Sequence, residues 1–102
     1  MAKFHFSRRA ETDAADIDEY TYRTWGEEQA VAYLNELENC CRLLAGNPKI
    51  GRACDEVRSG LRRMECGRHV IFYRKDRGGI VVVRILHQRM IPDRNTMAAD
   101  GM

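Results

Sequence analysis

At 102 residues, the chain is long enough for one compact domain with a modest core. It contains no run of about 18 apolar residues, so we expect no membrane-spanning helix. The first residues, MAKFHFSRRAE, lack the apolar middle region of a secretory signal peptide. Together these features predict a cytoplasmic protein that has no membrane partner.

The charge is unevenly distributed, although the net charge is only +2. Residues 1–47 hold five Lys/Arg and nine Asp/Glu, whereas residues 48–102 hold twelve Lys/Arg and six Asp/Glu. Of the 17 basic residues 14 are arginine, whose guanidinium pairs in bidentate fashion with carboxylate or phosphate. This asymmetry favours a basic C-terminal half that binds an acidic partner, either a nucleic acid or a protein surface.

The N-terminal half predicts a short strand over residues 4–6 followed by two helices. Ser7 is suited to cap the first helix, which we expect to run to about residue 24. Gly26 breaks this helix, a second begins at Glu27, and Gly46 and Pro48 end it. Apolar residues recur at three- and four-residue spacing in both segments, so residues 7–46 predict an antiparallel helical hairpin. The inner positions of the two helices are Ala10, Ala14, Ile17, Thr21 and Trp25, then Ala30, Leu34, Leu37, Cys41 and Leu44.

The C-terminal half predicts three short strands, at residues 57–64, 69–74 and 80–87, after a loop at residues 47–56. Cys66-Gly67 indicates one turn, and the run from Asp76 to Gly79 indicates a hairpin, because glycine readily adopts positive φ. The last strand is the most apolar and should be central. By alternation, Val81, Val83 and Ile85 should face the core, and Val82, Arg84 and Leu86 the other side.

These elements occur in the order β-α-α-β-β-β, which predicts a two-layer α+β domain with a helical hairpin packed on a small antiparallel sheet. We expect one domain over residues 1–92 and a flexible tail over residues 93–102. One sheet face should pack on the helices, leaving an arginine-rich face free to bind. Arg84 lies within VVVRIL and therefore needs either a water-filled groove or an acidic partner, which another protein or an internal carboxylate such as Glu65 would supply.

The four cysteines, at positions 40, 41, 54 and 66, contain no CxxC pair. A zinc site would need help from His69 and His87, and we expect no metal and no cofactor. In a reducing compartment these cysteines should instead be reduced and act as small hydrophobic residues.

The stretch GLRRMECGRHVIFYR, followed by VVRILHQR, resembles the C-terminal half of ParE-type toxins, which belong to the ParE/RelE superfamily of plasmid stabilisation and toxin–antitoxin modules. The N-terminal half, with Trp25-Gly26 before the second helix, resembles the helical hairpin of the same family. The resemblance extends from about Phe4 to about Met90. It implies a toxin that inhibits DNA gyrase by protein–protein binding, catalyses no reaction of its own and is neutralised by a ParD-like antitoxin.

The resemblance also implies two binding surfaces. The toxin would form a hetero-oligomer with an antitoxin that folds onto the hairpin groove and an open sheet edge, and DNA would be contacted only through the antitoxin. The expected antitoxin-binding residues are Tyr20, Trp25, Tyr33, Leu34, Leu37 and Leu44. The expected target-binding residues are Arg58, Arg62, Arg63, Arg68, Arg84, His87, Arg89 and Met90.

The alternative is a ribosome-dependent mRNA endoribonuclease of the RelE type, in which Arg68, His69, Arg84 and His87 would be catalytic. Against this alternative, no tyrosine follows His87, Lys49 is the only lysine of the central loop, and the modest net charge does not favour tight RNA binding. A toxin that has lost its target, or a nucleic-acid-binding protein without catalysis, would share the same sequence features.

Overall fold

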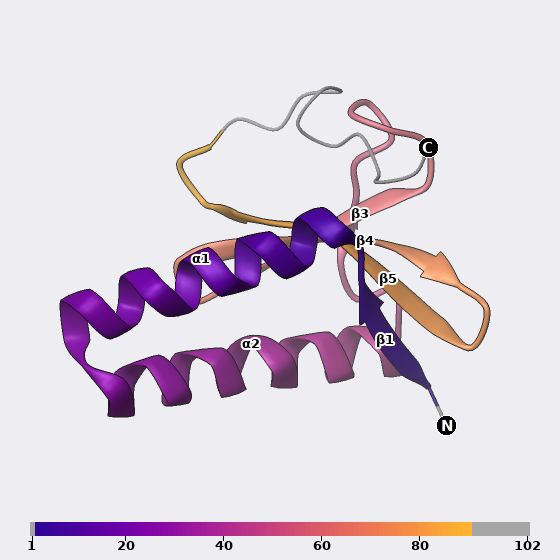
Figure 1. Cartoon of the computed structure of the whole chain (residues 1–102). Helices are drawn as coiled ribbons and strands as arrows, with labels where there is room; N and C mark the ends of the chain where they lie inside the picture. The colour runs from indigo at the N-terminus through magenta and orange to yellow at the C-terminus, as the bar shows by residue number, and fades with distance from the viewer. Residues whose placement is uncertain (1, 91–102) are drawn as a thin grey trace.

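A computed structural model describes residues 2–90 of the chain, in which two helices pack on a five-stranded sheet (Figure 1). The expected α+β architecture is confirmed. The expected domain boundary at residue 92 and the tail over residues 93–102 lie outside the described residues. The elements are β1 (Lys3–Phe6), α1 (Arg8–Trp25), α2 (Glu27–Gly46), β2 (Arg52–Ala53), β3 (Leu61–Cys66), β4 (His69–Asp76) and β5 (Gly79–His87).

The helical hairpin forms where the sequence predicts it. The Ser7 hydroxyl accepts a hydrogen bond from the backbone N–H of Ala10 at 3.1 Å, which satisfies one of the unpaired donors of the first turn. Gly26 has a φ of 92° and separates the two helices, so that they run antiparallel side by side (Figure 1). Neither helix is long and apolar enough to cross a membrane, within the part of the chain that the structure describes.

The sheet has the strand order β1-β5-β4-β3-β2 and is mixed rather than wholly antiparallel. β1 pairs in parallel with β5, with Lys3 opposite Gly79 and Phe6 opposite Val82. The other neighbours are antiparallel, and the two-residue strand β2 forms an edge that the sequence did not predict. The sheet is mixed because β1, the first strand of the chain, pairs with the last strand, β5, and runs in the same direction at the edge of the sheet.

The strand expected over residues 57–64 begins later, at Leu61. Asp55 prevents an earlier start, because its carboxylate accepts the backbone N–H of Gly60 at 2.8 Å. The backbone N–H of Val57 donates to the Cys54 carbonyl at 3.0 Å, which closes a turn over the residues between them. Gly60, with a φ of 80°, completes this turn immediately before β3.

A β-bulge in β5 makes the expected alternation wrong. Phe72 pairs with Arg84 and Tyr73 with Val82, so Val83 is an extra residue on β5. The bulge turns Val83 to the opposite face from Ile85, with which the sequence pattern had grouped it. As a result Ile80, Val82 and Ile85 join the main core beneath the helices.

The sheet face away from the helices is not a free binding face. A second apolar cluster lies there, in which Phe72, Val83 and Leu86 are almost wholly buried against Cys54 and Leu61. The segment preceding β3 therefore covers part of the surface on which the arginine-rich face was expected.

The cysteines also differ from the expectation. Cys40 of α2 and Cys66 at the end of β3 form a disulfide, with their Cα atoms 6.7 Å apart. Cys41 and Cys54 are free and buried, in keeping with a role as small hydrophobic residues. Burial raises the pKa of the Cys41 thiol to about 12, which keeps this thiol protonated and unreactive near neutral pH.

Candidate functional site

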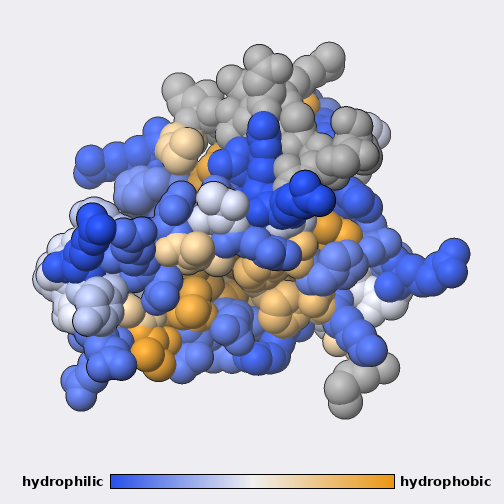
Figure 2. Space-filling view, in the orientation of Figure 1, coloured by the Kyte–Doolittle hydropathy of each residue, from blue (hydrophilic) through white to orange (hydrophobic). Residues whose placement is uncertain are grey.

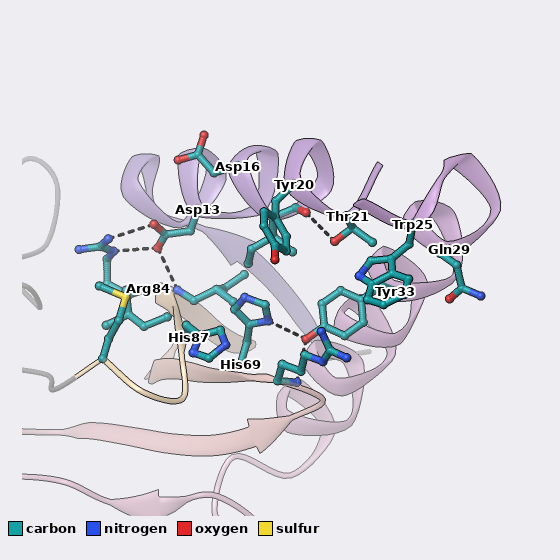
Figure 3. A pocket seen from close by; sticks show the side chains of 15 residues that line it. Asp13, Asp16, Tyr20, Thr21, Trp25, Gln29, Tyr33, His69, Arg84 and His87 are labelled. Atoms are coloured by element: carbon teal, nitrogen blue, oxygen red, sulfur yellow. Dashed lines mark hydrogen bonds and ion pairs between the residues drawn. The ribbon is translucent and has the colours of Figure 1, made fainter. Parts of the chain in front are cut away.

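A cavity of about 800 Å³ opens between α1, the first turns of α2, the start of β4 and the end of β5 (Figure 3). We call it the groove. Its lining residues are Asp13, Asp16, Ile17, Tyr20, Thr21, Trp25, Gln29, Tyr33, Arg68, His69, Arg84, Ile85, Leu86, His87 and Met90.

The α1 wall of the groove follows from helical spacing. Asp13, Ile17 and Tyr20 lie three or four residues apart and so share one face of the helix. Ile17 is buried, whereas the Tyr20 side chain remains 65% exposed above it. Trp25 was expected in the core but is 57% exposed, and the Arg68 guanidinium lies 5.8 Å from its ring centroid. This geometry permits a cation–π contact at one end of the groove.

Asp13 and Arg84 form a nearly buried ion pair at the other end of the groove (Figure 3). Arg84 Nε donates to Asp13 Oδ2 at 2.7 Å, and a terminal guanidinium nitrogen donates to Oδ1 at 2.9 Å. The Asp13 carboxylate also accepts the backbone N–H of Ile85 at 2.9 Å. It thereby caps the edge of β5 beyond the point where β1 ends.

The internal partner of Arg84 is therefore Asp13, and the expectation of Glu65 was wrong. Glu65 lies instead near Arg52 and Arg63, at 3.5 and 3.7 Å. Asp13 was overlooked in the sequence because acids early in a helix are usually solvated complements of the helix dipole. The available signal was its position four residues before the buried Ile17.

A hydrogen-bonded cluster around Tyr33 forms the floor of the groove (Figure 3). The Tyr33 hydroxyl lies 2.6 Å from Nδ1 of His69 and accepts the backbone N–H of Arg68 at 3.0 Å. The His87 ring meets the His69 ring edge to face, with centroids 5.5 Å apart. Tyr33 thus fixes the turn between β3 and β4 and orients His69, while the pairing of β4 with β5 places His87 beside His69.

The environment of His69 favours its neutral form. Burial lowers the pKa of His69 below its ordinary value of 6.5, and the neighbouring His87 and Arg68 lower it further, while Asp13 opposes them. In a neutral imidazole, Nδ1 can accept a hydrogen bond from the Tyr33 hydroxyl. Burial likewise raises the pKa of Tyr33, so the phenol remains a donor.

The residues expected at the target surface do not form one face. Arg68, Arg84, His87 and Met90 line the groove, and Arg89 adjoins it through a backbone hydrogen bond to His87 at 3.2 Å. Arg58, Arg62 and Arg63 are not among the lining residues. Because Arg62 and Arg63 are adjacent on β3, they point to opposite faces of the sheet. Arg62 binds the Gly51 carbonyl, and the Arg63 guanidinium lies 5.3 Å from the Phe72 ring centroid.

The residues expected at the antitoxin surface divide in the same way. Tyr20, Trp25 and Tyr33 line the groove. Leu34 is half-buried, while Leu37 and Leu44 belong to the main core and are almost fully buried. The sequence did not single out Asp16, Thr21 or Gln29, which also line the groove.

Residues 2–90 contain no group of three or more His, Cys, Asp or Glu side chains that could hold a metal ion. His69 and His87 are instead directed to Tyr33 and to each other. What the groove offers is a mixture of exposed aromatic surface and cationic hydrogen-bond donors, which is suited to a peptide with apolar and acidic side chains.

Residues 4–92 match the protein-family model described as the ParE toxin of the type II toxin–antitoxin system parDE. The chain therefore belongs to the ParE toxin family. It is 46% identical over 95 residues to a protein named toxin ParE1 from Mycobacterium tuberculosis, covering 92% of this chain and 97% of the relative. It is 34% identical over 103 residues to toxin ParE of Escherichia coli, covering 100% and 98%.

The fold is also found in a solved structure described as the chromosomal ParDE toxin–antitoxin system from P. aeruginosa. The TM-score is 0.72, with 18% identity, covering 85% of this chain and 96% of that one. The similarity confirms the fold.

Replacing Asp13 should destabilise the protein strongly. Asp13→Ala removes the carboxylate that pairs with the Arg84 guanidinium, whose side chain is 15% exposed, and that accepts the Ile85 N–H. We expect a loss of about 3 kcal/mol in the free energy of unfolding, measured by urea denaturation. Glu19→Ala is the control, since it breaks the exposed Arg23–Glu19 pair and should cost at most about 1 kcal/mol. Equal losses in the two variants would contradict the role given to Asp13.

His69 should make stability depend on pH in the acidic range. Since its pKa is lowered in the folded state, the unfolded chain binds the proton more readily. The contribution of His69 to the free energy of unfolding is therefore constant above pH 6.5, its ordinary pKa. It is lost as the pH falls below 6.5 towards the lower pKa of the folded state. Thermal unfolding midpoints at several pH values should fall less steeply for His69→Asn than for the unsubstituted chain. A parallel fall in both would assign the pH dependence to other groups.

Proposed function

We propose that this ParE-family chain is the toxin of a type II toxin–antitoxin pair, that a ParD-like antitoxin neutralises it, and that it inhibits DNA gyrase by binding to it. The observation that carries this proposal is the groove, in which exposed aromatic side chains lie beside the cationic Arg68. The antitoxin is supported by the description of the matching family and by that of the similar solved structure, which both refer to a toxin–antitoxin system. The proposed function needs no cofactor, and its setting is the bacterial cytoplasm.

Surface chemistry supports the hairpin side as the antitoxin site. Figure 2 shows apolar surface gathered between α1 and α2 and bordered by hydrophilic side chains. Tyr20 and Trp25 add large exposed aromatic area at the groove, and Arg68 offers a cation. An acidic segment with apolar side chains, folding onto this surface as a helix or strand, would bury the aromatic area and pair with Arg68. Leu37 and Leu44 would support this surface from the core rather than contact the antitoxin.

Removing Trp25 should weaken antitoxin binding much more than removing a comparable aromatic elsewhere on α1. Trp25 and Tyr22 are 57% and 59% exposed, but only Trp25 lines the groove. Interface tryptophans commonly contribute 2 kcal/mol or more, so Trp25→Ala should raise the Kd for the cognate antitoxin roughly 30-fold or more. Tyr22→Ala should change it less than about threefold. Isothermal titration of the two purified variants decides between these outcomes, and equal losses would place the antitoxin elsewhere.

The proposed target-binding surface contains fewer residues than the sequence analysis predicted. Arg68, His87, Arg89 and Met90 lie together at or beside the groove, where the two guanidinium groups and the Met90 thioether would contact an acidic protein surface. Arg84 would support them through Asp13 rather than meet the target directly. Arg58, Arg62 and Arg63 would act as a separate basic region on and before β3.

Inhibition of gyrase should depend on this end of the groove. Toxin freshly released from antitoxin should prevent gyrase from supercoiling relaxed plasmid while leaving reporter mRNA intact on translating ribosomes. Arg68→Ala/Arg89→Ala should require at least about tenfold more protein for the same inhibition, since two rim cations are lost. Arg23→Ala/Arg42→Ala removes the same charge from exposed helical ion pairs and should inhibit normally. Full inhibition by the first double variant would exclude this surface.

Ribonuclease activity is the second candidate, because Arg68, His69, Arg84 and His87 all line the groove. Three features argue against it. Asp13 binds the Arg84 guanidinium in bidentate fashion, and Nδ1 of His69 is engaged with Tyr33. Phe72 and Tyr73, the aromatic residues of β4, are buried and do not offer a surface on which bases could stack. Cleaved mRNA together with normal supercoiling in the same assay would favour the nuclease and refute the gyrase proposal.

A further inference from the structure

The disulfide joins the two elements that position the floor of the groove. Cys40 belongs to α2, and Cys66 is the last residue of β3, immediately before the turn that leads to Arg68 and His69. Tyr33 lies seven residues before Cys40 on α2, and its side chain binds the turn between β3 and β4. Its hydroxyl accepts the Arg68 N–H at 3.0 Å and lies 2.6 Å from His69 Nδ1 and 3.4 Å from the Cys66 carbonyl oxygen.

This turn has little freedom while the disulfide is closed. Gly67 has a φ of 61°, and a side chain at that position would collide with the Tyr33 ring, so the turn lies directly against α2. The Cys66 sulfur also lies 3.7 Å from the Glu36 carbonyl oxygen of α2. The disulfide is thus the covalent part of a contact whose other part is the Tyr33 hydrogen-bond cluster.

We propose that Cys40 and Cys66 form a reversible redox-modification site, in which a dithiol reductant opens the disulfide, loosens the turn carrying Arg68 and His69, and weakens binding in the groove. That the occupant of the groove is the antitoxin rests on the proposed function. In reducing compartments protein disulfides are usually transient and regulatory, which is consistent with a bond placed beside a binding site.

The exchange proceeds through a mixed disulfide. A thiolate of the reductant attacks the Cys40 sulfur, because Cys40 is half-buried whereas Cys66 is only 4% exposed. The Cys40–Cys66 bond breaks, and Cys66 leaves as a thiolate that takes up a proton. The second thiolate of the reductant then attacks its own mixed-disulfide sulfur and releases Cys40, which is also protonated. The protein gains two electrons and two protons, and the dithiol becomes a disulfide; exchange with an oxidised dithiol reverses the reaction.

The first test is a thiol count on the full chain. Alkylation under denaturing, non-reducing conditions should modify two cysteines, Cys41 and Cys54, in the oxidised protein and four after treatment with dithiothreitol. Reduction should lower the Tm by at least about 8 °C, because the crosslink no longer restricts the unfolded chain. Four reactive thiols after treatment with an oxidised dithiol would overturn the proposal.

The second test measures the turn and the groove in the two redox states. Reduction should accelerate hydrogen exchange of the Arg68 amide and raise the Kd for the cognate antitoxin on the order of tenfold, because an ordered turn must then be formed on binding. Cys40→Ser/Cys66→Ser should behave as the reduced protein under all conditions. Cys41→Ala is the matched control, because it keeps the disulfide and should keep the response to dithiothreitol.

The outcomes separate the two proposals. An antitoxin that binds both redox forms equally, with unchanged Arg68 exchange, overturns the redox site and leaves the proposed function intact. An antitoxin that binds neither form refutes the proposed partner instead. In that case Arg68 exchange decides the redox site by itself, since acceleration on reduction supports it and unchanged exchange overturns it.

Discussion

The nearly buried pair between Asp13 and Arg84 is the interaction on which the arrangement of this molecule depends. β1 covers β5 only as far as Val82, and beyond that point the edge of β5 would present an unpaired backbone N–H. Asp13 supplies the missing acceptor from α1 while also neutralising Arg84. Because one carboxylate holds both the helix and the strand, the distance between α1 and the sheet is fixed, and the groove remains open beyond it.

The same groove then combines two kinds of surface that the sequence keeps apart. Aromatic side chains come from the acidic, helical half of the chain, and the arginine and histidine side chains come from the basic, strand-forming half. Tyr33 joins the halves, since its single hydroxyl contacts the backbone of the turn and the ring of His69. A partner that fills the groove would therefore contact both halves, and its binding would depend on their relative position.

The same geometry supports the proposed binding function over the endoribonuclease alternative. Four residues that could serve an endoribonuclease are close together, but the two with the most useful groups are committed to internal partners. A guanidinium paired with a carboxylate has little positive charge left for a developing phosphorane. The groove is accordingly better suited to recognition than to proton transfer.

The sequence by itself determined the elements that depend on local chemistry. Ser7, Gly26 and Pro48 set the ends of the helices, and the Asp76–Gly79 run set the hairpin between β4 and β5, because helix ends and turns require particular side chains, positive φ or a proline. Local pattern alone could not reveal the parallel pairing of β1, the bulge at Val83, the Asp13–Arg84 pair or the Cys40–Cys66 disulfide. The β1 pairing, the ion pair and the disulfide join segments distant in the sequence, and the bulge is a single inserted residue that reverses which side chains face the core. The aromatic and basic side chains of the groove could therefore be predicted from the sequence, but its acidic wall and its assembly were decided by tertiary contacts.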